Sequence, residues 1–272
     1  MNRLTRPPVV VGVGPDTSPA VVDVAAAEAS LRGLPLHLLS VHPSAGAGPH
    51  DAFTASLHRV AAQWSPRLAV TARDVSGDPG TELVAASRAA ALVVVGQGGD
   101  GALAMQVAAH ALCPTMVVPA GPPASGGPVL LGLALQANEE AAIGYAFEAA
   151  DLRRVPLTVA HVWAGLPGDA LGAVNPFSYD VREAYAAADR MVAEGIAGWA
   201  GKYPDVTVER MPLYDPNPAR TLLDLSTTAG LVVVGARRGD RHSEQLGGIS
   251  RRLIAGASCP VVVVRLARAA YE

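Results

Sequence analysis

Glycine and arginine residues between positions 235 and 252 form the part of this sequence best suited to chemistry, and that chemistry is phosphate binding. The apolar run at 231–234 ends in Gly235, and Gly247 and Gly248 precede a stretch expected to be helical. Glycine lets backbone N–H groups approach phosphate oxygens without an intervening Cβ. A helix N-terminus adds unpaired donors and a favourable dipole. Arginine suits phosphate because its planar fork binds two oxygens at once, and the arginines here are Arg237, Arg238, Arg241, Arg251 and Arg252.

This segment is the second copy of a pattern that the chain contains twice. The apolar run 92–96 ends in glycine and leads to a Cys-Pro pair at 113–114, just as the run 231–235 leads to a Cys-Pro pair at 259–260. The second copy is longer in its glycine loop and between its second and fourth apolar runs. A period this long indicates duplicated domains rather than a solenoid of short repeats.

Apolar runs alternate with helix-like stretches in both copies, and this predicts an α/β fold. The runs are unbroken rather than alternating, which is typical of parallel strands covered on both faces. We expect strands at 8–13, 36–41, 68–75, 91–95 and 115–118, and then at 129–134, 157–163, 206–211, 230–234 and 261–264. The predicted architecture is two tandem, doubly wound domains with five-stranded parallel sheets, at 1–119 and 128–272, joined by a linker at 120–127.

The helices between these strands should cover both faces of each sheet. We expect them at 19–32, 51–64, 81–90, 102–111, 139–153, 179–199, 219–227 and 250–257. The fifth strands, at 115–118 and 261–264, are apolar and lie at sheet edges in this topology, so they invite pairing. The sequence therefore predicts that the two copies meet as an internal pseudo-dimer, and that the chain also forms a homodimer.

Composition narrows the function further. The chain has 272 residues and a net charge of −3, which favours neither nucleic acid nor anionic membrane as a partner. Its apolar runs are too short to cross a bilayer. The two cysteines lie in separate copies beside apolar strands, as expected for core thiols in a reducing compartment. We expect a cytoplasmic protein. The seven histidines show no metal-ligand spacing, so no metal site is expected.

In the order of their motifs, both copies resemble the universal stress protein family in its tandem form. The shared features are a first strand ending in Val-Gly-Val, Gly77-Asp78-Pro79 before a helix, a Val-Val-Gly strand end, and a Cys-Pro segment before the last strand. The resemblance covers nearly the whole chain and implies a Rossmann-like fold, similar to adenine nucleotide alpha hydrolases. It also implies a site for an adenine nucleotide at the glycine loop.

Each copy departs from the family's nucleotide signature. That signature resembles Gly, two residues, Gly, nine residues, then Gly followed by Ser or Thr. In the second copy Gly239 is one place late, with Arg238 at the expected position, and Gly248 replaces the hydroxyl residue. In the first copy the nine-residue span is missing, and Ala102 replaces the hydroxyl residue.

The family's aspartate after the first strand, which looks toward the adenosine, is replaced by Gly14 in the first copy and Ala134 in the second. Asp16 follows two residues later and could substitute only if its loop bends differently. We therefore expect the first copy to be structural and any ligand to lie in the second. The expected nucleotide-binding residues are Ala134, Val162, Gly235, Arg238, Gly239, Gly247, Gly248, Ile249, Ser250 and Arg251.

Three functional hypotheses fit these features. The first is a non-catalytic stress protein that binds ATP, accompanied by Mg²⁺, and signals its state to a protein partner that the sequence does not identify. The second is a scaffold of the same fold that binds no nucleotide and acts through its surface and strand edges. The third is an ATP hydrolase, which the sequence favours least. Phosphoryl transfer needs a positioned nucleophile and usually Mg²⁺ ligands, and the loop supplies only Asp240, Ser243 and Glu244 for these roles.

Overall fold

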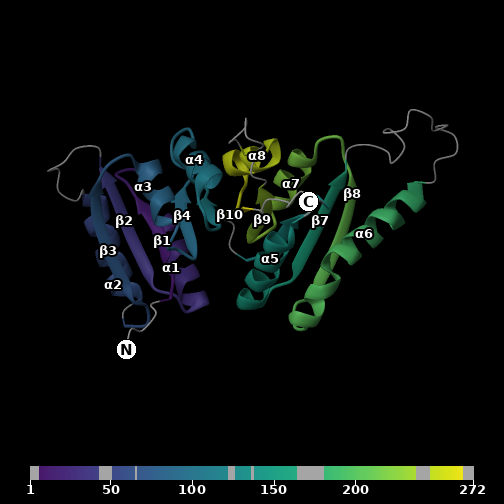
Figure 1. Ribbon diagram of the computed structural model, residues 1–272, viewed down its shortest axis with the longest axis horizontal. Helices are drawn as coiled ribbons and strands as arrows, with labels where there is room; N and C mark the ends of the chain where they lie inside the picture. Colours follow the sequence, from purple (N-terminus) through teal and green to yellow (C-terminus); the bar gives the residue numbers. More distant parts are fainter. Residues whose placement is uncertain are drawn as a thin grey trace, which may run out of the picture.

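The computed structural model describes residues 6–42, 51–64, 66–121, 126–135, 138–163, 181–236 and 246–265. Its strands form one ten-stranded sheet in the order β3-β2-β1-β4-β5-β10-β9-β6-β7-β8 (Figure 1). The first-half strands are β1 Val9–Val13, β2 Leu36–His42, β3 Val70–Ser76, β4 Leu92–Gly96 and β5 Thr115–Val118. The second-half strands are β6 Val129–Gly132, β7 Leu157–Trp163, β8 Val208–Tyr214, β9 Leu231–Ala236 and β10 Val261–Arg265.

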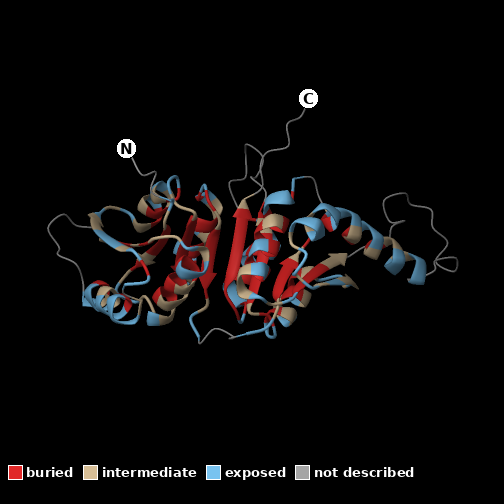
Figure 2. Ribbon diagram, turned by 90° about the horizontal axis from the view of Figure 1, so that it is seen from below, coloured by how far each residue is buried: buried red, intermediate tan, exposed pale blue. Residues whose placement is uncertain are grey.

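Helices cover both faces of the sheet. They are α1 Pro19–Arg32, α2 Asp51–Trp64, α3 Pro79–Ala86, α4 Ala102–His110, α5 Glu140–Arg153, α6 Val181–Lys202, α7 Pro218–Ser226 and α8 Gly248–Gly256. One core layer contains residues of α1, α2, α5 and α6, including Phe53 and Phe147. The other contains residues of α3, α4, α7 and α8, including Leu83 and Leu253. The central strands are almost wholly buried between these layers (Figure 2), which explains their unbroken apolar runs.

Within each half the strands run parallel, as predicted, and the strand order reverses between the first and fourth strands of the half. The sequence predicted an alternating α/β fold with tandem units, and the structure confirms it. Several boundaries differ. β8 runs two residues past Pro212, although the sequence predicted an end at 211. Proline is tolerated there because β8 is an edge strand and the missing N–H faces no neighbour. α3 begins at Pro79, since Asp78 caps it by accepting a hydrogen bond from the N–H of Thr81 at 2.8 Å.

The two halves are joined through their fifth strands. β5 and β10 pair antiparallel, with Met116 opposite Val262, so two five-stranded sheets become one. The sequence predicted that the fifth strands lie at sheet edges. In the structure neither is a free edge, because β5 and β10 pair with each other. The internal pseudo-dimer is confirmed. Since the first-half and second-half strands run in opposite directions, their carboxyl ends lie at opposite ends of the sheet.

Candidate functional site

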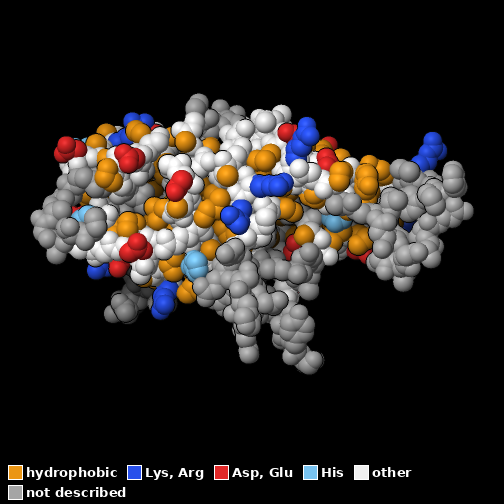
Figure 3. Space-filling model, turned by 90° about the horizontal axis from the view of Figure 1, so that it is seen from above, with side chains coloured by type: hydrophobic (Ala, Val, Ile, Leu, Met, Phe, Trp, Pro, Cys, Tyr) orange, Lys and Arg blue, Asp and Glu red, His pale blue; other side chains and the backbone are white. Residues whose placement is uncertain are grey.

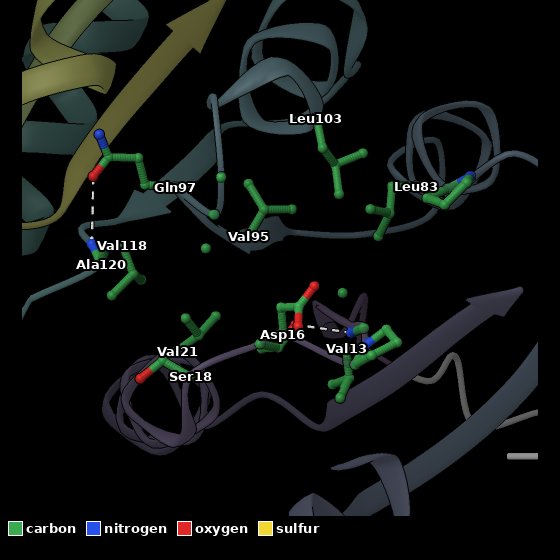
Figure 4. A pocket seen from close by; sticks show the side chains of 18 of the residues that line it. Val13, Asp16, Ser18, Val21, Leu83, Val95, Gln97, Leu103, Val118 and Ala120 are labelled. Atoms are coloured by element: carbon green, nitrogen blue, oxygen red, sulfur yellow. Dashed lines mark hydrogen bonds between the residues drawn. The ribbon is translucent and has the colours of Figure 1, made fainter. Parts of the chain in front are cut away.

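A pocket of about 500 Å³ lies in the first half, at the carboxyl ends of β1 and β4. In an open parallel sheet this place, where strand order reverses, is the usual position of a ligand. The pocket is bounded by the β1–α1 loop on one side and the β4–α4 glycine loop on the other (Figure 4). The sequence placed no ligand in this half, so the pocket itself was not foreseen.

Two glycines that line this pocket allow close packing between its strands and the helices that cover them. A Cβ built on Gly12 would lie 3.0 Å from a methyl of Leu83, and one built on Gly96 would lie 3.1 Å from a methyl of Val21. Gly12 is the second-to-last residue of β1 and Gly96 is the last of β4, and the backbone there approaches the covering helices closely.

The glycine loop of the first half places a carboxylate at the start of α4. Asp100 accepts a hydrogen bond from the backbone N–H of Ala102 at 3.0 Å. Gly98 and Gly101 have φ values of 41° and 74°, in the left-handed region that glycine enters readily. Asp16 also lines the pocket from the opposite loop. The β1–α1 loop therefore does bend so that Asp16 reaches the site.

In the second half the equivalent place lies at the carboxyl ends of β6, β7 and β9. Gly132 is level with Ala160 on β7 and with Val234 on β9. Ala134, Val162 and Gly235 each come one or two residues later on these neighbouring strands. The structure therefore brings together three of the predicted site residues at one end of the sheet.

The start of α8 carries five more predicted residues. Gly247 precedes the helix with φ −58°, and Gly248, Ile249, Ser250 and Arg251 follow it. Ser250 is buried, whereas Ile249 and Arg251 are exposed. Among the residues that the structure describes, no side chain caps this helix. The predicted residues Arg238 and Gly239 lie outside the described residues, as do Arg237, Arg241, Asp240, Ser243 and Glu244.

Glu139 is a site residue that the sequence analysis missed. Its carboxylate accepts a hydrogen bond from the backbone N–H of Ala134 at 3.2 Å, and the residue is only 7% exposed. In the first half the matching N–H, that of Gly14, donates instead to the hydroxyl of Thr17 at 2.8 Å. A carboxylate thus reaches the end of β6 from the start of α5. A search restricted to residues directly after the strand could not find it.

Comparison with known proteins identifies the family of this chain. A family model described as the universal stress protein family matches residues 5–119 and 127–265. The chain belongs to the universal stress protein family. Universal stress protein Rv1996 of Mycobacterium tuberculosis is 30% identical to it over 301 residues, which cover 95% of each chain. Universal stress protein Rv2005c of the same organism is 34% identical over 212 residues, covering 73% of this chain and 70% of that protein.

Solved structures share the fold of this universal stress protein. A universal stress protein from Archaeoglobus fulgidus superposes with a TM-score of 0.64 at 15% identity, covering 94% of this chain and 96% of that one. A functionally unknown protein, PA1789 from Pseudomonas aeruginosa, superposes with a TM-score of 0.69 at 16% identity, covering 97% and 93%. At these identities the likeness shows the fold alone.

In the described parts of the chain, no three or more His, Cys, Asp or Glu side chains gather where they could hold a metal ion. The helices in those parts include none with the length and apolarity needed to span a membrane.

Proposed function

We propose that this universal stress protein is a non-catalytic sensor that binds ATP in its second half, with the phosphates at the start of α8. The observation that carries the proposal is the contrast between the two equivalent helix starts. The first N–H groups of any helix lack partners within the helix and attract anions. At the start of α8, which is Gly247 followed by Gly248, no described side chain caps these N–H groups. At the start of α4 the N–H of Ala102 is already bonded to the Asp100 carboxylate.

Cationic side chains strengthen the site at α8. Arg251 ends its first turn, Arg252 follows in the second, and both are exposed. Arg252 donates a hydrogen bond to the side-chain oxygen of Asn217 at 3.0 Å, which holds the guanidinium beside the start of α7. Basic side chains lie near the centre of the surface in Figure 3, where α8 is found, while acidic ones gather over the first half. Arginine beside a helix N-terminus is a favourable setting for a phosphate chain.

The adenosine would lie beside Ala134, Val162 and Gly235, at the carboxyl ends of the second-half strands. The resemblance to the family implies an aspartate after the first strand, and Ala134 lacks the carboxylate. Glu139 brings one to the same loop by bonding the Ala134 N–H. We infer that Glu139 does the orienting work of that aspartate. A hydrogen bond to such a charged group contributes about 1.5–3 kcal/mol.

Two further parts of the proposal concern partners. Mg²⁺ would enter with the ATP phosphates, since the described residues offer no protein cage for it. A protein partner in the cytoplasm would read the ATP-bound state of the segment 235–250. A homodimer would need a surface other than the fifth strands, because β5 and β10 pair with each other. The scaffold hypothesis loses those strand edges for the same reason.

Calorimetric titration with ATP tests the proposal through one position. A Cβ on Gly247 would have no heavy atom within 4 Å, so side chains fit there. Asp and Asn cap helices about equally well, so Gly247→Asp and Gly247→Asn differ mainly in charge. We expect one ATP per wild-type chain and weaker binding by Gly247→Asn, whose side-chain oxygen takes one of the helix N–H groups. We expect a further loss of about tenfold or more for Gly247→Asp, because of its charge.

Two results would contradict this function. If the wild-type chain shows no ATP heat, the scaffold hypothesis is favoured. If all three proteins bind ATP equally, the phosphates do not lie at α8. Bound ATP should also be recovered intact after incubation, because the proposal includes no hydrolysis, and release of phosphate by the wild-type protein would favour the third hypothesis.

A further inference from the structure

The first-half pocket has apolar walls. They are formed by Val13, Val21, Val41, Leu83, Val95, Leu103 and Val118. A volume of about 500 Å³ is within the range of small-molecule sites in proteins. Several of these walls come from strands and helices of the buried core, so the pocket is built into the fold.

The charges at this pocket have one sign. Asp16 and Asp100 are the ionisable side chains among its described lining residues, which include no lysine, arginine or histidine. Figure 4 shows Asp16 across the open space from the wall of Leu83, Val95 and Leu103. Residues at the starts of α1, α3 and α4 line the pocket. Each helix N-terminus carries about half a positive charge, and the two carboxylate charges exceed the sum of these three. A phosphate ester placed here would therefore be repelled.

Asp100 also occupies the position that an anion would take. Its carboxylate accepts the N–H of Ala102 at the start of α4. The neighbouring wall is fixed, because the side chain of Gln97 accepts a hydrogen bond from the Ala120 N–H at 3.3 Å and donates one to the Ala255 carbonyl at 2.6 Å. The second of these bonds reaches α8 in the other half, so the glycine loop is held from both sides.

We propose that the first-half pocket binds a small organic cation with an apolar body, such as a protonated amine, and excludes phosphate esters. The apolar walls take the body of the ligand, and the carboxylates of Asp16 and Asp100 attract its charge. This site is separate from the ATP site proposed for the second half, since the carboxyl ends of the two sets of strands lie at opposite ends of the sheet. The proposal does not depend on ATP binding.

Three probes with one phenyl body and different charges test the ligand class. They are 2-phenylethylamine, a cation at neutral pH, 2-phenylethanol, which is neutral, and 3-phenylpropionate, an anion. Protein NMR titrations should place the amine's effects at the amides of Gly12, Gly96 and the glycine loop. We expect the amine to bind most tightly and the acid about tenfold or more weakly. Added salt should weaken amine binding and leave the alcohol unchanged.

Variants separate charge from space. Asp16→Asn and Asp100→Asn should each weaken the amine about two- to fivefold without affecting the alcohol. Asn at 100 can still cap α4 through its side-chain oxygen. Leu103→Trp should block both probes, because Leu103 lines the pocket and is 38% exposed. Leu31→Trp is its matched control, as Leu31 is 40% exposed on α1 and does not line the pocket.

The amine preference, its loss in the two Asp variants and the block by Leu103→Trp support the proposal. Equal binding of the acid and the amine would overturn it, as would amine binding that survives in a folded Leu103→Trp protein. Absence of amine binding at millimolar concentration would also overturn it. If Leu103→Trp fails to fold, the Asp variants still decide the point, because their substitutions are exposed and conservative.

Discussion

α4 and α8 begin at the same place in the two halves of this protein, yet their first turns differ in charge. α4 follows Asp100, whose carboxylate bonds the Ala102 N–H. α8 follows Gly247 and carries Arg251 and Arg252 in its first two turns. The strands beneath both helices have the same order and the same close-packed glycines, Gly12 and Gly132. The backbone therefore sets where a ligand can lie, and a few loop residues set which charge it can have.

The halves also differ where they meet. Arg32 ends α1 and Arg153 ends α5, and both bind the carboxylate of Glu28, which is 4% exposed. Arg32 also lies 3.2 Å from Glu148, and its guanidinium stacks 4.7 Å from the ring centre of Tyr145. Burial lowers the pKa of Arg153 to about 10 and raises that of Tyr145 to about 12. At neutral pH the arginine is thus charged and the phenol neutral. The first half supplies the buried carboxylate for both equivalent arginines.

The largest expected effect comes from breaking this asymmetric network. Glu28→Gln leaves Arg32 and Arg153 without their shared buried partner. We expect it to lower the free energy of unfolding by about 3–5 kcal/mol, the usual loss when one member of a buried ion pair is removed. Glu148→Gln is the matched control, since that side chain is 49% exposed. It should cost about 1 kcal/mol or less.

Urea denaturation followed by circular dichroism measures both variants. Equal losses for Glu28→Gln and Glu148→Gln would show that the buried carboxylate of the first half contributes no more stability than the half-exposed carboxylate of the second. The ratio of the two losses therefore measures how unequally the halves hold each other.

The sequence alone predicted most of this fold because apolar burial dominates it. The runs at β4, β5 and β10 are almost wholly buried, so their pattern was unambiguous. β3 and β8 are sheet edges with exposed residues, and their boundaries were wrong by one to three residues. The pairing of β5 with β10 followed from their apolar composition. Edge strands are harder because neighbours on one side only constrain their pattern.

The site was predicted less completely, for geometric reasons. Leu135 and Asn138 have φ values of 55° and 69°, which turn the chain so that Glu139 bonds back to Ala134. Such left-handed turns at residues other than glycine are hard to foresee from residue type. The shape of the first-half pocket depends on how Leu83, Val95 and Leu103 pack. The pattern of apolar residues in the sequence does not predict side-chain packing. The prediction that α8 holds the ligand remains a proposal.

A smaller expected effect tests whether the cores of the two halves are alike, although their loops before α4 and α8 differ. Cys113 and Cys259 occupy matching places in the same core layer. Burial raises the pKa of the Cys113 thiol to about 11 and that of the Cys259 thiol to about 12, from an ordinary value of 9.0. The folded state thus holds these protons more tightly than the unfolded chain does. Stability is unaffected by the thiols below about pH 9 and falls above it, by up to about 1.4 kcal/mol per pH unit and thiol.

Cys113→Ala and Cys259→Ala each remove one of these contributions. Between about pH 9 and pH 10, each variant should lose about 1 kcal/mol less stability than the wild-type protein, whatever its stability at neutral pH. Denaturation curves recorded at both pH values give the difference. Unequal effects of the two variants would show that the cores of the two halves differ. If both variants lose as much stability between these pH values as the wild-type protein, the loss does not come from the thiols.

The smallest expected effect concerns the ends of α1 and α5. The two halves place different residues in the same left-handed backbone conformation there. Gly33 is the C-cap residue after α1, with φ 61°, and Arg154 is the C-cap residue after α5, with φ 54°. Both N–H groups bond back to the preceding helical turn. A side chain in this left-handed conformation costs about 1–2 kcal/mol, part of which is offset because glycine is freer when unfolded. Arg154→Gly should therefore stabilise the protein by up to about 1 kcal/mol, and Gly33→Ala should destabilise it by a similar amount.

Arg154→Ala separates the backbone effect from loss of the arginine. It keeps the Cβ in the left-handed conformation and removes the charge, which interacts favourably with the C-terminal end of a helix. We expect Arg154→Gly to be more stable than Arg154→Ala by about 1 kcal/mol in urea denaturation. If the two are equal, the end of α5 relaxes without strain, and the resemblance between the halves does not extend to the conformation of their helix ends.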